Sequence, residues 1–361
     1  MNKKPYWKVM VLAISALMMS RAQAEVTFPD SVFSNLDYGL YWFGYVDAEK
    51  AQPGQLNNFY DKNKKTVIYI HGWQNNSVTR AARETLDRRA SGGPAEDLSQ
   101  YWLDRGWNVG ILYWNQFADE SEVKDAEAKI YTTSGPKNMR WKKLNGSYQT
   151  GPSQPVAQLL FEAIRDNMAD FNHSQFRLTG HSLGNQVALE VGKRLNDAVD
   201  AGQLSSNLRP DRIALLDPFY SNGAKSYLGN QWPGEIARDN ADALINDGVA
   251  IETYRSSPVT STMFIGDANK ALMDKTAFSE LKPWNFNFWQ LTEKHLAAVT
   301  WYFWSMDFAT PDVRNESLDA PSASSSDSAI KTLMNKSWGV NHRRGAYTGS
   351  PADDDFNKKN R

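Results

Sequence analysis

The chain has 361 residues, 41% of them hydrophobic and 12% aromatic, so it can bury a sizeable core as one large domain or two small ones, and its composition excludes a disordered chain. Residues 1–24 hold four of the 40 basic residues and none of the 41 acidic ones, so the remainder has a net charge of −5 and gives no electrostatic case for nucleic acid as a partner. The absence of cysteine excludes disulfides, thiolate metal sites and cysteine-linked lipid anchors.

The first 24 residues differ from the rest and predict a cleaved secretory signal. Three lysines among the first eight residues precede an apolar run of 11 residues (9–19, VMVLAISALMM), and Ala-Gln-Ala follows at 22–24. A membrane span needs about 20 apolar residues, so this run is short for one, although an uncleaved anchor is the alternative. We therefore expect an exported protein, secreted or periplasmic and of bacterial type.

Short apolar runs alternate with helix-like segments through the middle of the chain. Residues 25–60 (YGLYWFGYVDA within them) are candidates for edge strands. Buried strands are expected at 66–70, 108–114, 176–179, 212–216 and 249–254, and helices at 78–89, 155–168 and 185–198. This alternation predicts an α/β fold with a mostly parallel twisted sheet and helices on both faces.

Two polar segments interrupt this pattern. Residues 116–154 and 219–247 are expected to be insertions over the strand ends, and either could act as a lid. The acidic stretch ADESEVKDAE in the first insertion leaves open a structural calcium ion or a solvated helix face. We expect one catalytic domain over 25–310 and a polar, partly flexible tail over 311–361, where DAPSASSSDS has low complexity.

The segment FRLTGHSLGNQ contains a G-x-S-x-G pattern at Gly180, Ser182 and Gly184. A predicted strand precedes Ser182 and a predicted helix follows it, which is the context of a nucleophile elbow. The two glycines let strand and helix approach closely, and the helix N-terminus directs free N–H groups at the site. The alternative is a glycine-rich turn with a passive serine.

A serine nucleophile needs a histidine base, and the chain has five histidines. The nucleophile–acid–histidine order of this fold excludes His71, His173 and His181, which lie before or inside the elbow. His295 begins an apolar helical run (KHLAAVTWYFW) and is the expected base. His342, in the polar segment VNHRRGA, is the alternative.

The expected acid is Asp217, which follows the apolar run RIALL directly and therefore lies at the carboxyl edge of the sheet. Asp267 is the runner-up. The oxyanion hole needs two N–H donors. They are expected from Leu183, after the nucleophile, and from Trp73 in the IHGW segment, where Gly72 lets the backbone come close.

The segments IHGW, NVGILYWN, GHSLGNQ, LLDPF and KHLAAVTWYFW, over roughly residues 60–306, resemble the pancreatic-lipase-like group of α/β-hydrolases. The Asp-Pro directly after the strand that follows the elbow is the most discriminating part. The resemblance implies Ser182, Asp217 and His295 as a catalytic triad, with Trp73 and Leu183 as oxyanion donors. The chain departs from that group in having no cysteine, Asn185 after the elbow, and no recognisable C-terminal lipid-binding sandwich.

We therefore expect a secreted serine ester hydrolase acting on lipid or fatty-acyl esters, with a lipid–water interface as one place of action. A short-chain esterase, a phospholipase A1 or an acyltransferase would use the same triad. A catalytically silent binding module is the alternative of another class. No cofactor is required, and histidines without paired spacing argue against zinc. The sequence does not specify an oligomeric state.

Overall fold

A computed structural model describes residues 26–88, 97–259 and 266–361. The predicted signal segment, 1–24, lies outside these residues. Within them, no helix combines the length and the apolar character that crossing a bilayer requires.

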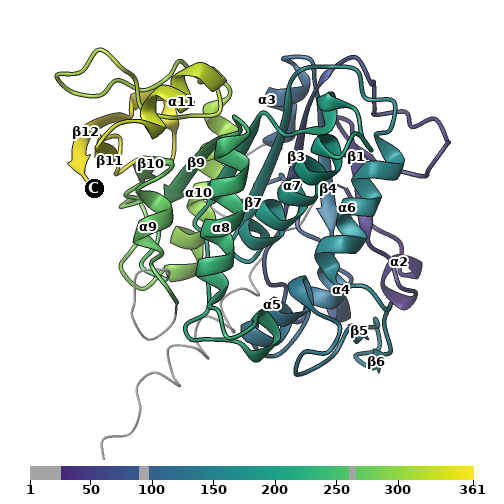
Figure 1. The fold of residues 1–361 in the computed structure, drawn as a ribbon. Helices are drawn as coiled ribbons and strands as arrows, with labels where there is room; N and C mark the ends of the chain where they lie inside the picture. The colour runs from purple at the N-terminus through teal and green to yellow at the C-terminus, as the bar shows by residue number, and fades with distance from the viewer. Residues whose placement is uncertain (1–25, 89–96, 260–265) are drawn as a thin grey trace, which may run out of the picture.

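The centre of the molecule is a 10-stranded sheet in the order β12-β11-β10-β9-β8-β7-β3-β4-β1-β2 (Figure 1). Strands β4, β3, β7, β8, β9, β10 and β11 run parallel, whereas β1, β2 and β12 are antiparallel to their neighbours. The bounds are β1 Gly39–Phe43, β2 Ala48–Lys50, β3 Lys65–Ile70, β4 Trp107–Tyr113, β7 Phe176–His181, β8 Arg212–Leu216, β9 Ala250–Arg255, β10 Ala277–Glu280, β11 Trp338–Arg344 and β12 Asp355–Asn360.

Helices cover both faces of the sheet because alternate side chains of each buried strand point to opposite faces. In β3, Ile68 and Ile70 join one core, while Val67 and Tyr69 join the other. The first core packs under α6 (Val156–Asn167), α7 (Gly184–Asp200) and α8 (Pro233–Asn246), which Figure 1 shows in front of the sheet. The second packs under α3 (Ser99–Leu103), α10 (Leu291–Ser305) and α11 (Asp327–Met334). This confirms the predicted α/β-hydrolase fold.

The remaining elements are short and connect or flank the sheet. They are α2 Ser31–Ser34, η1 Val78–Arg80, α4 Asn115–Ala118, α5 Val123–Tyr131, β5 Trp141–Lys142, β6 Tyr148–Gln149, η3 Ser206–Leu208, η4 Ser226–Leu228, α9 Lys270–Met273 and η5 Pro351–Asp353. Because the central strands are parallel, the segments that follow β3, β7, β8, β9, β10 and β11 meet at one carboxyl edge of the sheet.

Two of the predicted helical or inserted segments differ from expectation. The helix expected over 78–89 is reduced to η1, because Ala81 takes a left-handed conformation (φ 50°) and Arg83 turns inward to Asp37 and Asn115. The segment 219–247, expected to be an insertion, contains α8, which is the crossover helix between β8 and β9. Its Ala237, Ala241 and Leu244 belong to the core.

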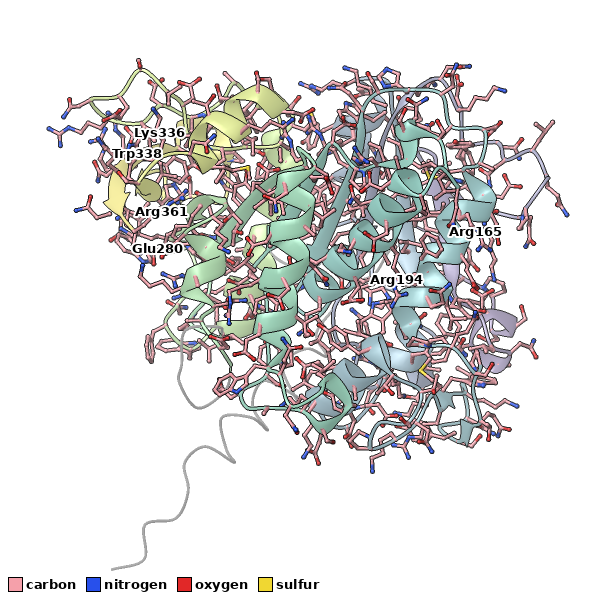
Figure 2. All side chains as sticks on the ribbon, in the orientation of Figure 1. Arg165, Arg194, Glu280, Lys336, Trp338 and Arg361 are labelled. Carbon is pink, nitrogen blue, oxygen red and sulfur yellow. The ribbon has the colours of Figure 1, made fainter. Side chains whose placement is uncertain are left out.

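The C-terminal segment is a larger correction: the polar, partly flexible tail predicted over 311–361 is instead part of the sheet. Strands β11 and β12 extend it, and Figure 2 labels Trp338 on β11 and Arg361, the residue after β12. Part of the serine-rich stretch (320–323 and Ser325) is buried, and Arg177 donates to Ala323 O (2.8 Å) and Arg212 to Ser325 O. Small side chains allow this backbone to approach two buried guanidinium groups, which low complexity alone does not reveal.

Candidate active site

Ser182 occupies a sharp turn between β7 and α7. Its φ is 55°, a left-handed conformation that strains a residue with a side chain. A Cβ on Gly180 would lie 2.3 Å from Gly184 O, and one on Gly184 would lie 2.2 Å from Ile70 O. Only glycine fits both positions, so the G-x-S-x-G pattern has here the steric cause that a nucleophile elbow requires.

Asp217 follows β8, the neighbour of β7, and is also left-handed (φ 40°) and fully buried. Its Oδ1 accepts the N–H groups of Ser256 (2.8 Å) and Ser257 (3.1 Å). Its Oδ2 accepts Ser257 Oγ–H and His295 Nδ1–H, the latter at 2.5 Å. Four donors therefore fix the orientation of this carboxylate.

His295 lies in the second turn of α10, 2% exposed, with its Nδ1 directed at Asp217. No hydrogen bond to its Nε2 occurs among the described residues, so that nitrogen is left for a reacting proton. The His181 ring packs against the His295 ring at 4.4 Å between centroids, and its Nε2–H donates to His295 O (3.1 Å). Burial, together with the neighbouring His295, lowers the pKa of His181 to about 3, so this contact comes from a neutral imidazole.

The structure thus brings Asp217 and His295 together, with Ser182 at the end of the adjoining strand. Ser182 N–H donates to Leu216 O (3.2 Å), and Ser182 O accepts the N–H of Phe219 (3.3 Å). These bonds tie the elbow to the Asp217 turn. Within the described residues, Ser182 Oγ has no hydrogen-bond partner.

The loop after β3 lies directly against the elbow. A Cβ on Gly72 would come within 2.7 Å of Ser182 Cβ, so glycine is required for this approach. His71 braces the loop: its Nδ1–H donates to Gly72 O (2.9 Å), and its Nε2 accepts the N–H of Trp114 (3.1 Å). The second bond requires a neutral ring, and burial lowers the pKa of His71 to about 4.

Trp73 and Leu183, the predicted oxyanion donors, border this junction of loop and elbow. The Trp73 side chain is buried and donates to Glu120 O (2.7 Å), which anchors its ring away from solvent. Leu183 is fully buried at the start of α7. Among the residues described, neither backbone N–H has an acceptor.

Ion pairs with buried carboxylates hold the segment 116–154 together. Glu120 binds Lys129 (2.7 Å) and Arg140 (2.5 Å), and Asp119 binds Lys142 (2.9 Å). Burial lowers the pKa of Lys129 to about 8. The acidic stretch is therefore packed inward rather than forming a solvated helix face. In the described ranges, no group of three or more His, Asp or Glu side chains is placed to hold a metal ion.

Three positioning residues were missed by sequence reasoning. Ser256 and Ser257 follow β9 directly and hold Asp217, but serine after a strand carries no distinctive pattern. Glu127, on α5, is fully buried, which raises its pKa, and it accepts Gln186 Nε2–H (2.7 Å) and Ser221 N–H (2.9 Å). It thereby ties α5 to α7 and to the segment that follows Asp217.

The two sequence alternatives lie elsewhere. Asp267 N–H donates to Tyr220 O (2.8 Å), and its carboxylate accepts Asn269 N–H (2.8 Å) rather than a histidine. His342, on β11, pairs with Asp354 (2.8 Å).

No protein-family model matches this chain, and no curated protein matches it. Similar solved structures include the LpqC poly(3-hydroxybutyrate) depolymerase from Bordetella parapertussis, with 14% identity and a TM-score of 0.30 over 59% of this chain and 64% of that one, just under two thirds of its length. An esterase from Pyrobaculum calidifontis has 10% identity and a TM-score of 0.35, covering 83% of this chain and 90% of that one. At these values the likenesses carry no argument about activity, which must come from the geometry.

Proposed function

We propose that the chain is a serine carboxylic-ester hydrolase of lipase-like type, which cleaves lipid or fatty-acyl esters through an acyl-serine intermediate. One observation carries the proposal: a strained serine at a glycine-flanked elbow adjoins a buried Asp217–His295 pair at the next strand end. A left-handed serine is costly, and backbone strain of this kind clusters at active sites.

In the proposed reaction, Ser182 Oγ attacks the carbonyl carbon while its proton passes to His295 Nε2. The N–H groups of Trp73 and Leu183 stabilise the negative oxygen. His295 then gives the proton to the departing alcohol, and the acyl group stays on Ser182. A water molecule attacks the acyl-enzyme, His295 takes and returns its proton, and the carboxylic acid leaves. Asp217 holds Nδ1–H throughout and stabilises the imidazolium. No cofactor enters this scheme.

The position of the acid supports the resemblance to the pancreatic-lipase-like group. Asp217 directly follows β8, the strand after the elbow strand, and Pro218 follows it. Export of the chain through residues 1–24 is also part of the proposal. Mass measurement of the protein from the producing cell should give an N-terminus at Glu25; an intact Met1 would contradict it.

Activity-based labelling tests the nucleophile. A fluorophosphonate probe should label the wild-type chain at Ser182, and Ser182→Ala should lose labelling and about 10⁴-fold or more of its kcat on soluble esters. The control is Ser205→Ala, at the N-cap of η3, which should keep full activity. A folded Ser182→Ala variant that still hydrolyses esters would refute the proposal, and an unlabelled wild type would favour a silent binding module.

A further inference from the structure

An exposed aromatic surface lies beyond β10 and β11, on the carboxyl edge that also carries the Asp217–His295 pair. We call it the aromatic rim, and its members are Trp284 (47% exposed), Phe288 (84%), Trp289 (70%) and Tyr347 (75%). The first three lie between β10 and α10, and Tyr347 lies between β11 and β12. Trp284 contacts Tyr347, and Phe288 and Trp289 lie on the same loop as Trp284; a surface patch of exposed apolar side chains is typical of an interaction site.

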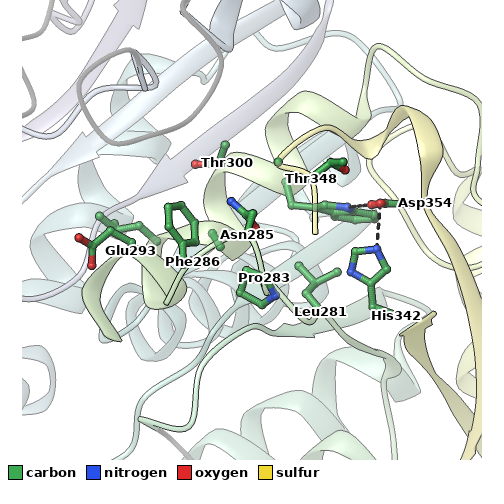
Figure 3. A pocket seen from close by; sticks show the side chains of 13 residues that line it. Leu281, Pro283, Asn285, Phe286, Glu293, Thr300, His342, Thr348 and Asp354 are labelled. Carbon is green, nitrogen blue, oxygen red and sulfur yellow. Dashed lines mark hydrogen bonds and ion pairs between the residues drawn. The ribbon is translucent and has the colours of Figure 1, made fainter. Parts of the chain in front are cut away.

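The rim is held in place rather than loosely attached. The N–H groups of Trp284 (2.8 Å) and Asn285 (3.1 Å) both donate to Ala346 O, which joins two segments far apart in the sequence. The Trp284 and Tyr347 rings lie 5.4 Å apart. Figure 3 shows Leu281, Pro283 and Phe286 lining the pocket beneath this loop. The loop therefore has its own apolar base, and the rim is preorganised to meet a partner.

A groove of about 210 Å³ lies beside the rim. We call it the basic groove, because Arg255, Lys282 and Lys294 line it together with Trp284. Its single acidic member, Glu280, labelled in Figure 2, is neutralised by Arg255 (2.8 Å) and Lys359. Lys282 Nζ lies 5.3 Å from the Trp284 ring centre. In the described part of the chain, Lys282 and Lys294 form no ion pair, so the groove is net positive.

The basic groove also adjoins the candidate active site. Ser256 and Ser257 line it, and the backbone N–H groups of both donate to Asp217 Oδ1. Lys294 immediately precedes His295, and its carbonyl accepts Ser256 Oγ–H (2.6 Å). A group held in the groove would therefore lie next to the residues that orient the imidazole.

We propose that the aromatic rim and the basic groove together dock the protein on the surface of an anionic phospholipid bilayer. Tryptophan and tyrosine favour the boundary between headgroups and acyl chains, and lysines beside them favour anionic headgroups. An apolar partner alone would not explain the basic groove, and an anionic partner alone would not explain the aromatic rim. The proposal deepens the proposed function, on which it rests, because docking there presents lipid esters to the edge that carries Ser182. Glu293, whose carboxylate no cation pairs in the described residues, opposes such docking.

Flotation of the full-length chain with vesicles tests this surface. Vesicles of phosphatidylcholine alone are compared with vesicles containing about 30% phosphatidylglycerol, at low and high salt. The wild type should bind the anionic vesicles more tightly and lose that preference in salt. Lys282→Gln with Lys294→Gln should weaken anionic binding about 25-fold, since each basic residue near such a surface contributes about a five-fold gain. Glu293→Gln should strengthen it.

Phe288→Ser with Trp289→Ser should weaken binding to both vesicle types by at least about ten-fold. Matched controls lie in the segment before β3, at the opposite edge of the sheet: Leu56→Ser, which removes a fully exposed leucine, and Lys64→Gln. Both should bind as the wild type does. Residues 1–25 are the same in every variant, so they do not contribute to the differences.

Three results would overturn the proposal: wild-type binding that ignores phosphatidylglycerol, rim variants that bind like the wild type, or a rim that proves to join two copies of the chain in solution without vesicle binding. The failure of docking and the failure of the proposed function are distinguishable. Docking is measured without turnover, whereas hydrolysis of a soluble short-chain ester needs Ser182 and should be unchanged in the rim and groove variants.

Discussion

The described part of the chain contains two buried His–Asp pairs whose surroundings differ. His295 binds Asp217 through Nδ1 (2.5 Å), which leaves Nε2 without a partner in the described residues. His342 binds Asp354 through Nε2 (2.8 Å), and its Nδ1 accepts the N–H of Lys282 (3.4 Å). Figure 3 shows the second pair, where Asp354 also accepts Trp301 Nε1–H (2.5 Å).

The difference teaches that proximity of histidine and aspartate does not by itself make a proton-transfer pair. The His342 ring uses both nitrogens and stacks on Phe356, with ring centres 5.0 Å apart. Both of its nitrogens are occupied by hydrogen bonds, and its partner Asp354 also binds Trp301 of α10. The His295 ring, by contrast, leaves Nε2 without a partner in the described residues, and the proposed mechanism uses that nitrogen for proton transfer.

The largest expected effect comes from replacing the aspartate of each pair, Asp217 or Asp354, by asparagine. Asp217→Asn should lower kcat on a soluble ester by about 10³- to 10⁴-fold, because the imidazole loses its orienting acceptor. Asp354→Asn should leave kcat within about three-fold but lower the free energy of unfolding by roughly 1–3 kcal/mol, since one buried donor loses its acceptor. Steady-state kinetics and urea unfolding separate the two outcomes. Equal losses of kcat in the two variants would erase the distinction.

Lowering the pH should reduce the free energy of unfolding, because His71 and His181 are buried as neutral imidazoles in the folded chain. The folded pKa values are about 4 for His71 and about 3 for His181, below the unfolded value of about 6.5. Below that unfolded pKa the unfolded chain binds more protons, so the stability present above pH 6.5 is lost as pH falls. Each histidine contributes about 1.4 kcal/mol per pH unit in this window.

Urea unfolding at pH 7 and pH 5 measures this loss. His71→Asn should lose less stability than the wild type over the same interval, because one of the two proton-binding sites is gone. His173→Asn, at a partly exposed position before β7, is the control and should keep the wild-type dependence. An unchanged slope in His71→Asn would show that His71 is not a source of the acid sensitivity.

The serine donors to Asp217 should have a smaller effect. Ser257→Ala removes one of four hydrogen bonds to the carboxylate, so we expect kcat to fall about ten-fold with little change in KM. Ser257→Thr keeps the hydroxyl and should restore kcat. A Ser257→Ala loss that appears only in the unfolding free energy would reduce Ser257 to a structural residue.

Backbone strain at the elbow gives the smallest expected effect. Ser182→Gly and Ser182→Ala both remove the hydroxyl, but only glycine adopts φ near 55° without cost. The glycine variant should therefore have a free energy of unfolding about 1 kcal/mol higher than that of the alanine variant. Equal stabilities would mean that the turn stores no strain.

The strands and helices around the elbow could be predicted because their apolar runs and glycines act locally. The runs that became β3, β4, β7, β8 and β9 are mostly apolar, as is typical of strands buried on both faces. The end of the chain could not be predicted in this way. Its serine-rich stretch reads as flexible, yet Arg177 and Arg212 from β7 and β8 bind its carbonyl groups. Contacts that distant in sequence leave no local pattern.

The sequence by itself determined the α/β architecture, the elbow at Ser182, and Asp217 and His295 as candidates. Apolar strand runs and the glycines that permit close backbone approach are local patterns, so they can be recognised from neighbouring residues. Only the tertiary structure decided that Asp217 meets His295 rather than His342, that Ser256 and Ser257 hold the carboxylate, and that Asp119 and Glu120 form ion pairs in the interior. These depend on which strand ends adjoin, and adjacency in the sheet follows from packing of the whole chain.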